Sequence, residues 1–300
     1  MCREGAWTEL TVTVTMLSGI QSRTCDIKRI LKGRPNAFPF FKVNSNITIH
    51  SRRQSDGGNQ MLELKGVSKK YGGRAVVDGL SFCVEPGQVL GLLGANGAGK
   101  STCIGMIATL IKPDKGEILF NGENIVKNPK AIRKKLGYVP QDIALYESLN
   151  GLDNLKFWGK SYGVESGKLK EEISRVCNII SFDEALLKKR VSEYSGGMKR
   201  RLNIGVALLH NPELVVLDEP TTGIDLQSGE QILKAIRELS SAGTAIIYVG
   251  HYMEEVESIC THLCILDKGK SKAYGTAEGL LKETGCSTLK DLYSSLLGKQ

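Results

Sequence analysis

The sequence predicts a mixed α/β domain built around a buried, largely parallel sheet. From Met61 onward, segments patterned as strands alternate with segments patterned as helices, as in α/β proteins. Two short apolar runs, Leu214–Leu217 and Thr244–Val249, are typical of strands buried on both faces. A chain of 300 residues with 41% hydrophobic content is also long enough to enclose a substantial core.

Periodicity and turn residues place the other elements. An Asn-Gly pair at 121–122 predicts a hairpin turn, and Pro113 is expected to follow the end of a helix. The expected elements are strands at Val76–Val84 and Gln88–Leu93, a helix at Lys100–Leu110, a hairpin of Glu117–Phe120 with Asn124–Val126, and a charged helical region over about 142–190.

The distribution of charge along the chain argues against nucleic-acid binding by the residues after position 60. The net charge of +8 would favour such a partner if it were spread over the domain. Residues 1–60 hold nine Lys/Arg against four Asp/Glu, whereas the other 240 residues hold 31 against 28. The basic excess therefore lies mostly in the leading segment, and no nucleic acid is expected as a partner of the rest.

Residues 1–60 differ from the remainder, because they lack sustained helical or strand periodicity. We expect them to be a disordered extension, or a stretch ahead of a true start at Met61. No segment of the chain approaches the ~20 consecutive apolar residues that a membrane-spanning helix needs. If the protein acts on transport across a bilayer, another chain is expected to supply the channel.

A glycine-rich segment joins the strand ending at Leu93 to the expected helix. It fits the phosphate-binding pattern G-x-x-x-x-G-K-[ST], in the strand–loop–helix context that this pattern requires. Glycines let backbone N–H groups point at phosphate oxygens, and a helix N-terminus favours an anion. Lys100 would offer its charge to the β- and γ-phosphates, and the Ser101 hydroxyl would bind Mg²⁺. The nucleotide-binding residues expected in this segment are Gly94, Asn96, Gly97, Gly99, Lys100, Ser101 and Thr102.

Two adjacent carboxylates, Asp218 and Glu219, follow the apolar run at 214–217. The C-terminal end of a parallel strand is where α/β sheets present ligand sites. Asp218 is expected to hold Mg²⁺, as in other ATPases with such a loop, and Glu219 to polarise the attacking water as general base. An Asp-Glu-Pro turn alone is often only solvated. Together with the loop at Lys100, however, the pair predicts an ATP-hydrolysing site.

Other segments, by their order and spacing, resemble the ATP-binding cassette (ABC) family. Tyr194–Leu202 contains Ser195, Gly196 and Gly197 and resembles the family signature. The resemblance implies that these three residues bind the γ-phosphate of ATP held by the opposite protomer. A hydroxyl, glycine amides and a helix N-terminus are indeed suited to an anion. The resemblance covers about Met61–Gly279.

Four single residues complete the resemblance. Gln141 matches the glutamine that touches Mg²⁺ or water and links to the membrane partner, and Asp225 matches the loop that crosses the dimer interface. His251 matches the switch histidine at the γ-phosphate, and Tyr71 matches the aromatic that stacks on adenine. By this resemblance the catalytic residues are Glu219, His251 and Gln141, and the Mg²⁺ ligands are Ser101, Gln141 and Asp218.

The resemblance also implies an architecture. It predicts a P-loop NTPase fold with a RecA-like α/β core, an antiparallel β edge near Leu62–Val84 and Glu117–Val126, and a helical subdomain at about 142–200. The cassette domain is expected over residues 61–285, followed by a C-terminal tail at 286–300. ATP and Mg²⁺ are the implied cofactors.

The residues from Thr221 to Asp225 and those after His251 are similar to the ABC-2, daunorubicin-resistance-like export group, whose permeases are separate chains. This similarity implies a separate transmembrane permease, a second cassette that we expect to be an identical copy, and a place at the cytoplasmic face of the cell membrane. It favours export over import, and a pair of different cassettes stays open.

Three positions depart from the family pattern. Met198 stands where Gln is usual, and Tyr194 where Leu is usual, but the Ser-Gly-Gly core between them is kept. Gly250 stands before His251 where Thr is common, and the missing side chain is expected to loosen the histidine. None of these changes removes a charged or catalytic group.

Three other functions compete with transport. ABC ATPases that act on ribosomes usually carry two cassettes, whereas this chain has one phosphate-binding loop. ABC ATPases of DNA repair split the cassette with long coiled coils, whereas only 118 positions separate Lys100 from Asp218. A binding-only regulator is disfavoured because Lys100, Asp218, Glu219 and His251 are all present. Transport therefore leads, by family analogy.

Overall fold

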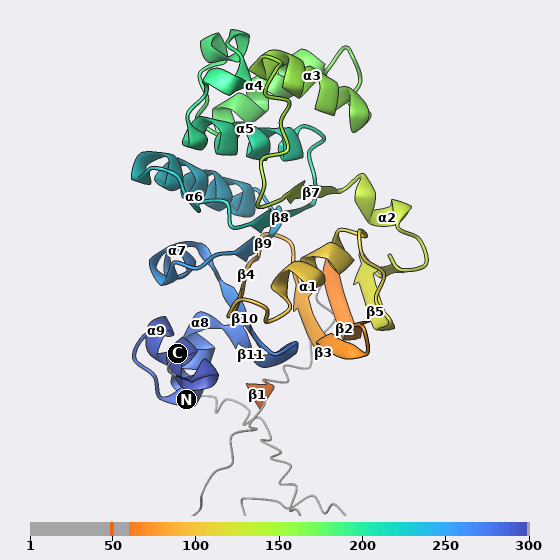
Figure 1. The fold of residues 1–300 in the computed structure, drawn as a ribbon, viewed down its shortest axis with the longest axis vertical. Helices are drawn as coiled ribbons and strands as arrows, with labels where there is room; N and C mark the ends of the chain where they lie inside the picture. Colours follow the sequence, from red (N-terminus) through yellow and green to blue (C-terminus); the bar gives the residue numbers. More distant parts are fainter. Residues whose placement is uncertain (1–48, 51–59, 299–300) are drawn as a thin grey trace, which may run out of the picture. The chain divides into compact units, whose positions relative to one another are not determined.

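The computed structural model describes residues 49–50 and 60–298, all within one unit, Ile47–Gln300 (Figure 1). The expectations for residues 1–60 therefore lie outside the described residues, apart from 49, 50 and 60. The strands are β1 (Ile49–His50), β2 (Leu62–Tyr71), β3 (Arg74–Val84), β4 (Val89–Gly94), β5 (Lys115–Phe120), β6 (Glu123–Asn124), β7 (Leu136–Val139), β8 (Leu214–Asp218), β9 (Ala245–Val249), β10 (His262–Asp267) and β11 (Lys270–Thr276). The α-helices are α1 (Lys100–Ile107), α2 (Lys130–Arg133), α3 (Gly151–Ser161), α4 (Leu169–Ile179), α5 (Gly196–Leu208), α6 (Leu226–Ser241), α7 (Met253–Ile259), α8 (Ala277–Thr284) and α9 (Leu289–Leu297).

The larger sheet has the order β1-β11-β10-β4-β9-β8-β7. The pairs from β10 through β4, β9 and β8 to β7 are parallel, and only β10 and β11 pair antiparallel. Every residue of β4, β8 and β9 is buried. The predicted buried parallel sheet is therefore confirmed. Because its strands run the same way, the segments after β4, β8 and β9 emerge at one edge.

The smaller sheet, in the order β3-β2-β5-β6, is antiparallel. It forms the predicted β edge, and β5 and β6 are joined at Asn121 and Gly122, both with positive φ, as the Asn-Gly pair predicted. Leu62, Leu80 and Ile118 of this sheet are fully buried in one apolar cluster with residues of α1. This packing holds α1 between the two sheets.

Helix α1 ends at Ile107, which is three residues earlier than the prediction of Leu110. The reason is local: Thr109 adopts a left-handed φ of 58°, and the amides of Leu110 and Ile111 both donate to the carbonyl of Gly105. This turn closes the helix before Pro113 can act as the predicted stop.

Three helices, α3, α4 and α5, make up the predicted helical region, with the short 3-10 turns η2 (Glu184–Lys188) and η3 (Val191–Glu193) between α4 and α5. Leu155, Val176 and Leu202 are fully buried where the helices meet. The side chain of Asn150 caps α3, and α5 continues to Leu208, beyond the expected limit of 200.

The C-terminal segment is folded. Leu289 and Leu292 of α9 are buried in the same apolar cluster as β9 and α7, so the expected tail at 286–300 contains a packed helix. Within the described residues, no helix has the length and hydropathy that crossing a membrane requires.

Candidate active site

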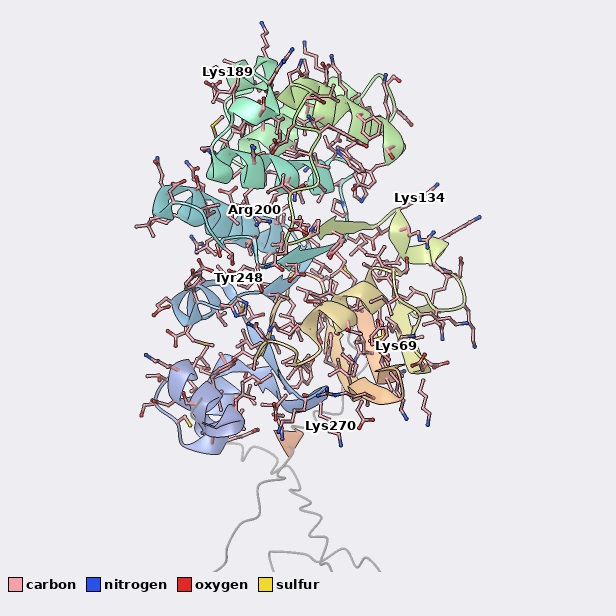
Figure 2. The ribbon with its side chains drawn as sticks, viewed as in Figure 1. Lys69, Lys134, Lys189, Arg200, Tyr248 and Lys270 are labelled. Atoms are coloured by element: carbon pink, nitrogen blue, oxygen red, sulfur yellow. The ribbon has the colours of Figure 1, made fainter. Side chains whose placement is uncertain are left out.

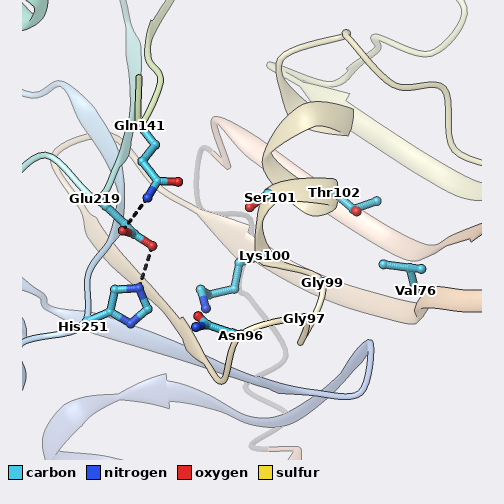
Figure 3. Close-up of a pocket in the computed structure, with 10 residues that line it drawn as sticks. All are labelled: Val76, Asn96, Gly97, Gly99, Lys100, Ser101, Thr102, Gln141, Glu219 and His251. Carbon is cyan, nitrogen blue, oxygen red and sulfur yellow. Dashed lines mark hydrogen bonds and ion pairs between the residues drawn. The ribbon is translucent and has the colours of Figure 1, made fainter. Parts of the chain in front are cut away.

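A cavity of about 470 Å³ opens where the segments after β4, β7, β8 and β9 meet (Figure 3). Its lining combines a glycine-rich loop with amide, carboxylate, imidazole and ammonium groups. The lining residues are Val76, Asn96, Gly97, Gly99, Lys100, Ser101, Thr102, Gln141, Glu219 and His251. The fold thus gathers into one cavity residues that lie up to 175 positions apart.

The loop between β4 and α1 wraps around the Lys100 amine. Lys100 Nζ donates to the carbonyl of Gly94 at 2.6 Å and to that of Ala95 at 3.1 Å. Gly99 has a φ of 105°, and a Cβ there would lie 2.6 Å from the carbonyl oxygen of Val76. Only glycine fits this turn, which brings the loop against β3 and leaves the amides at the start of α1 facing the cavity.

Burial sets the charges around the loop. Lys100 and Asp218 are each only 7% exposed. Burial lowers the pKa of the Lys100 amine, and the nearby carboxylates of Glu219 and Asp218 act in the opposite direction. Burial raises the pKa of Asp218, and the charge of Glu219 adds to the rise. Each charge thus offsets part of the desolvation cost of the other, and a bound anion would favour the charged lysine.

Glu219 lies between two polar side chains on the opposite side of the cavity (Figure 3). Gln141 Nε2 donates to Glu219 Oε2 at 3.0 Å, and His251 Nε2 lies 2.6 Å from Glu219 Oε1. The backbone of Glu219 is left-handed, with a φ of 50°, and its amide donates to the carbonyl of Val249 at 2.9 Å. A non-glycine residue in this region costs ~1 kcal/mol or more, so the surrounding fold holds the carboxylate in place.

Gln141 is itself fixed through its backbone. The buried guanidinium of Arg200, on α5, donates from Nη1 to the carbonyl of Gln141 at 2.6 Å and to that of Pro140 at 3.2 Å. Burial lowers the pKa of Arg200, and the charges of Asp142, Glu219 and Asp218 counteract the shift. Arg200 therefore ties the helical region to the loop that carries Gln141.

The Ser195–Gly197 segment lies at the start of α5 and does not line the cavity of its own chain. Ser195 Oγ accepts from the amide of Met198 at 3.2 Å. Asp225 caps α6 in the same way, accepting from the amide of Ser228 at 2.9 Å. A Cβ on Gly197 would overlap the Ser228 side chain. The starts of α5 and α6 are therefore in close contact, and glycine allows it.

Comparison with known proteins identifies the family. The sequence model of the ABC transporter family matches residues 77–222. The linearmycin resistance ATP-binding protein of Bacillus subtilis (strain 168) is 44% identical over 232 residues, which cover 77% of this chain and 74% of that protein. The chain belongs to the ABC transporter ATP-binding family. The cassette is also 40% identical to the Nod factor export ATP-binding protein I of Rhizobium sp. (strain N33), over 76% of this chain and 75% of that one.

The solved structures agree with the sequence matches. An ATP-binding subunit of an ABC transporter superposes with a TM-score of 0.73 at 30% identity, covering 79% of this cassette and 99% of that chain. The predicted P-loop NTPase fold is therefore confirmed. At the level of the family, the same matches confirm the predictions of an ABC transporter ATP-binding subunit, of an ATPase and of ATP as its nucleotide.

Most of the residues predicted from the sequence lie together. Of the predicted loop, all but Gly94 line the cavity, and Gly94 binds Lys100 through its carbonyl. Gln141, Glu219 and His251 line it too, and buried Asp218 lies directly before Glu219 in the cassette. Tyr71, predicted to stack on adenine, lies at the end of β2, is 49% exposed and is outside the lining. Lys69 Nζ lies 5.6 Å from the centre of its ring.

Three residues that line or support the cavity were not predicted from the sequence. Val76 lines the cavity, Arg200 holds the backbone of Gln141, and Tyr248 fills the space beside Gly250. A Cβ on Gly250 would overlap the Tyr248 ring, so the missing side chain is replaced by an aromatic one from the adjoining strand. Only Val76 carried a usable signal, because it begins the strand segment expected at 76–84.

The two changes beside the signature are also accommodated. Tyr194 is only 6% exposed, its ring lies 5.5 Å from that of Phe182, and its hydroxyl donates to the carbonyl of Leu186 at 2.8 Å. Met198 packs partly buried against the same apolar cluster. Tyr194 thus satisfies its polar atom inside the cassette core, as a buried tyrosine must.

Proposed function

We propose that this chain is the motor of an exporter, in which two copies clamp ATP between them and its hydrolysis drives a separate membrane permease. The observation that carries the proposal is Glu219 held between Gln141 and His251, in one cavity with the amine of Lys100. A carboxylate beside an imidazole, facing a phosphate-binding loop, is suited to activating water against a phosphoryl group.

The loop is the part that holds the nucleotide. Amides from Gly97 to Ser101 and the N-terminus of α1 would receive the phosphates, with Lys100 turning from the carbonyls of Gly94 and Ala95 to the β- and γ-phosphate oxygens. Tyr71, at the end of β2, is proposed as the adenine platform.

The donor set fits Mg²⁺. Ser101, Gln141 and Asp218 offer a hydroxyl, an amide and a carboxylate oxygen, the hard ligands that Mg²⁺ prefers. The described residues contain no cluster of three or more His, Cys, Asp or Glu side chains suited to a metal. This arrangement suits an ion held largely by phosphates and water. When bound, Mg²⁺ would neutralise charge on the β- and γ-phosphates.

Glu219 is proposed to take the proton from the attacking water, with His251 and Gln141 orienting its carboxylate. The 2.6 Å contact with His251 fixes one oxygen and the 3.0 Å contact with Gln141 fixes the other. His251 would also contact the γ-phosphate. Side chains placed this way contribute by position and by proton transfer, which together are worth ~10²–10⁴ in rate.

The second half of the clamp is proposed to come from another copy. Ser195–Gly197 lies outside the cavity of its own chain but keeps the hydroxyl, the amides and the helix N-terminus that suit an anion. Asp225, whose helix start contacts Gly197, would cross the interface beside it. Two identical copies would then close over two ATP molecules.

The relatives support an exporter whose permease is a separate chain. One is named for resistance to linearmycin and another for Nod factor export, and both are ATP-binding proteins. The present chain is proposed to act likewise at the cytoplasmic face of the cell membrane. Full-length tagged protein would be purified from native membranes in mild detergent. A co-purifying multi-spanning protein supports the proposal; ribosomal or DNA-associated proteins without a membrane chain would overturn the transport role.

The nucleotide site is tested separately. Lys100→Ala removes the ammonium from the cavity, and a lost charged hydrogen bond of about 1.5–3 kcal/mol weakens ATP affinity by about 10–100-fold. Lys112→Ala, at an exposed lysine outside the cavity lining, is the control. Equilibrium binding of a fluorescent ATP analogue measures both. Equal affinity in Lys100→Ala and the parent would contradict the assignment of the loop.

A further inference from the structure

A polar cluster of Thr221, Tyr248 and Glu255 lies outside the cavity lining, with Thr221 and Tyr248 buried and Glu255 partly buried. Tyr248, on strand β9, is fully buried, and its hydroxyl donates to Oε2 of Glu255 on α7. The hydroxyl of Thr221 donates to the same oxygen at 2.7 Å and lies 3.3 Å from the Tyr248 hydroxyl. One carboxylate oxygen thus accepts hydrogen bonds from two hydroxyl groups. Tyr248 can be located in Figure 2.

The three residues of this cluster lie close in sequence to the proposed catalytic pair, Glu219 and His251. Thr221 comes two positions after Glu219, Tyr248 three positions before His251, and Glu255 four positions after it. The amide of Glu219 also donates to the carbonyl of Val249, next to Tyr248. The cluster therefore connects the end of β8, which bears Glu219, with the segment between β9 and α7, which bears His251.

In this cluster the hydroxyl groups of Tyr248 and Thr221 donate, and the carboxylate of Glu255 accepts. Burial strongly raises the pKa of Tyr248, and the hydrogen bond to Glu255 raises it further, so the phenol stays protonated and acts as donor. Hydrogen bonds from hydroxyls to a carboxylate are short and stronger than those between neutral groups. A buried tyrosine is more simply accommodated with one backbone acceptor, as Tyr194 is with the carbonyl of Leu186 at 2.8 Å. Through Glu255, the Tyr248 hydroxyl is instead linked to the segment that follows β8 and to helix α7.

The Tyr248 ring occupies the space that a side chain at position 250, two residues later, would fill. A Cβ on Gly250 would overlap Cε1 of Tyr248, and the φ of Gly250 lies outside the left-handed region. The glycine is therefore required for space and not for its backbone conformation. Gly250, directly before His251, is thus part of the same arrangement, because the ring packs where its side chain would begin.

We propose that Tyr248, Glu255 and Thr221 form a positioning relay that holds His251 in register with Glu219 and transmits movement of the 221–225 loop to that pair. The proposal rests on the proposed function, in which Asp225 of this loop faces the second copy. When the second copy closes, a shift of Thr221 would pull on Glu255 and, through Tyr248, on the strand end before His251. The relay touches no substrate and acts only through the catalytic pair.

The test compares hydroxyl-deleting and hydroxyl-keeping variants of the full chain. Tyr248→Phe and Thr221→Val each remove a donor with little change of shape, whereas Thr221→Ser keeps the hydroxyl. Steady-state phosphate release over a range of ATP concentrations gives kcat and KM separately. We expect kcat to fall at least tenfold in Tyr248→Phe and Thr221→Val, with KM within twofold of the parent. Thr221→Ser should keep kcat within threefold.

Two controls separate positioning from stability. Tyr274→Phe removes a tyrosine hydroxyl that hydrogen-bonds with the backbone of Cys83, and neither residue lines the cavity. We expect it to lower the melting temperature without changing kcat. In a His251→Ala background, Tyr248→Phe should cause less than a twofold further loss, because residues that act as a unit are not additive.

Three outcomes would overturn the relay. A kcat within twofold of the parent in both Tyr248→Phe and Thr221→Val overturns the relay while leaving the proposed ATPase intact. A loss of kcat that Tyr274→Phe reproduces at the same melting temperature, or that is fully additive with His251→Ala, also overturns it. If the parent chain itself releases no phosphate, the proposed function fails and the relay with it.

Discussion

His251 Nε2 lies 2.6 Å from Oε1 of Glu219, although the two residues are 32 positions apart in the chain. Neighbouring parallel strands bring them together: β8 ends at Asp218 and β9 ends at Val249, and these two residues are register partners. Each functional side chain then follows its strand by one or two positions. The geometry is therefore fixed by strand pairing and not by the loops alone.

The first prediction concerns this contact. His251→Ala removes the partner of one Glu219 oxygen and should lower kcat by about 10²–10³-fold, the range of a well-placed acid–base group. ATP affinity should fall less than in Lys100→Ala, because only the proposed γ-phosphate contact of His251 is lost while Lys100 and the loop are untouched. Stopped-flow phosphate release and equilibrium nucleotide binding measure the two effects. A variant that keeps a tenth or more of the parent kcat would remove His251 from the proposed mechanism.

The second prediction concerns Arg200, which can be located in Figure 2. Arg200→Met keeps the buried stem but leaves the carbonyls of Gln141 and Pro140 without their charged donor, so the Gln141 loop should loosen. We expect a loss of about 1–3 kcal/mol in the free energy of unfolding together with a fall in kcat. Both are measured by urea unfolding and phosphate release.

The matched control for Arg200 is Arg175, whose guanidinium donates to the carbonyl of Leu208 at 2.7 Å in the helical region. Arg175→Met should lower stability without lowering kcat at a temperature where the protein stays folded. Equal kcat values for the two variants would show that Arg200 acts on stability alone.

The third prediction concerns the space beside Tyr248. Gly250→Ala places a methyl group against the ring, and overpacking of this kind costs about 1–3 kcal/mol. Gly229→Ala is the control, because a Cβ there meets nothing within 4 Å and alanine favours the helix α6 by up to about 1 kcal/mol. Differential scanning calorimetry should show melting temperatures that move in opposite directions. A rise for Gly250→Ala would contradict the observed packing.

The fourth prediction is a pH dependence of stability. His210 stacks on Tyr162 with ring centres 4.4 Å apart, and its Nε2 lies 3.1 Å from the carbonyl of Leu136. Burial lowers its pKa below the ordinary value of 6.5. Below pH 6.5 the unfolded chain therefore binds a proton that the folded chain does not, so this histidine makes stability fall as the pH drops.

His210→Gln keeps a donor for the carbonyl of Leu136 and removes the titrating group. Urea unfolding at several pH values from about 5 to 7.5 gives the free energy of unfolding for both proteins. The parent should lose more stability than the variant on the acidic side. Identical slopes would mean that His210 does not resist protonation in the fold.

The parts of this site that local chemistry determines were predictable from the sequence. The loop from Gly94 to Thr102 and the pair Asp218–Glu219 are contiguous, and each needs particular residue types in order. The buried strands β8 and β9 were readable because a strand covered on both faces must be apolar throughout. These elements supply most of the residues that line the cavity.

Contacts between distant segments could not be read in the same way. Nothing near Arg200 in the sequence shows that its guanidinium reaches the backbone of Gln141, 59 positions earlier. From the sequence, Gly250 indicated only a missing side chain. The Tyr248 ring fills that space, and the direction of the ring depends on sheet packing. The end of α1 was misplaced because a left-handed Thr109 is not favoured by its residue type.

In the proposed mechanism, two copies of this chain close over ATP and hydrolysis at Glu219 opens the clamp. It is tested most directly by sedimentation velocity of the full-length Glu219→Gln protein with ATP, with ADP and without nucleotide. We expect a dimer with ATP but not with ADP or without nucleotide, loss of that dimer when Ser195→Arg is added, and no detectable phosphate release. A monomer in all three conditions, or hydrolysis at the parent rate, would contradict it.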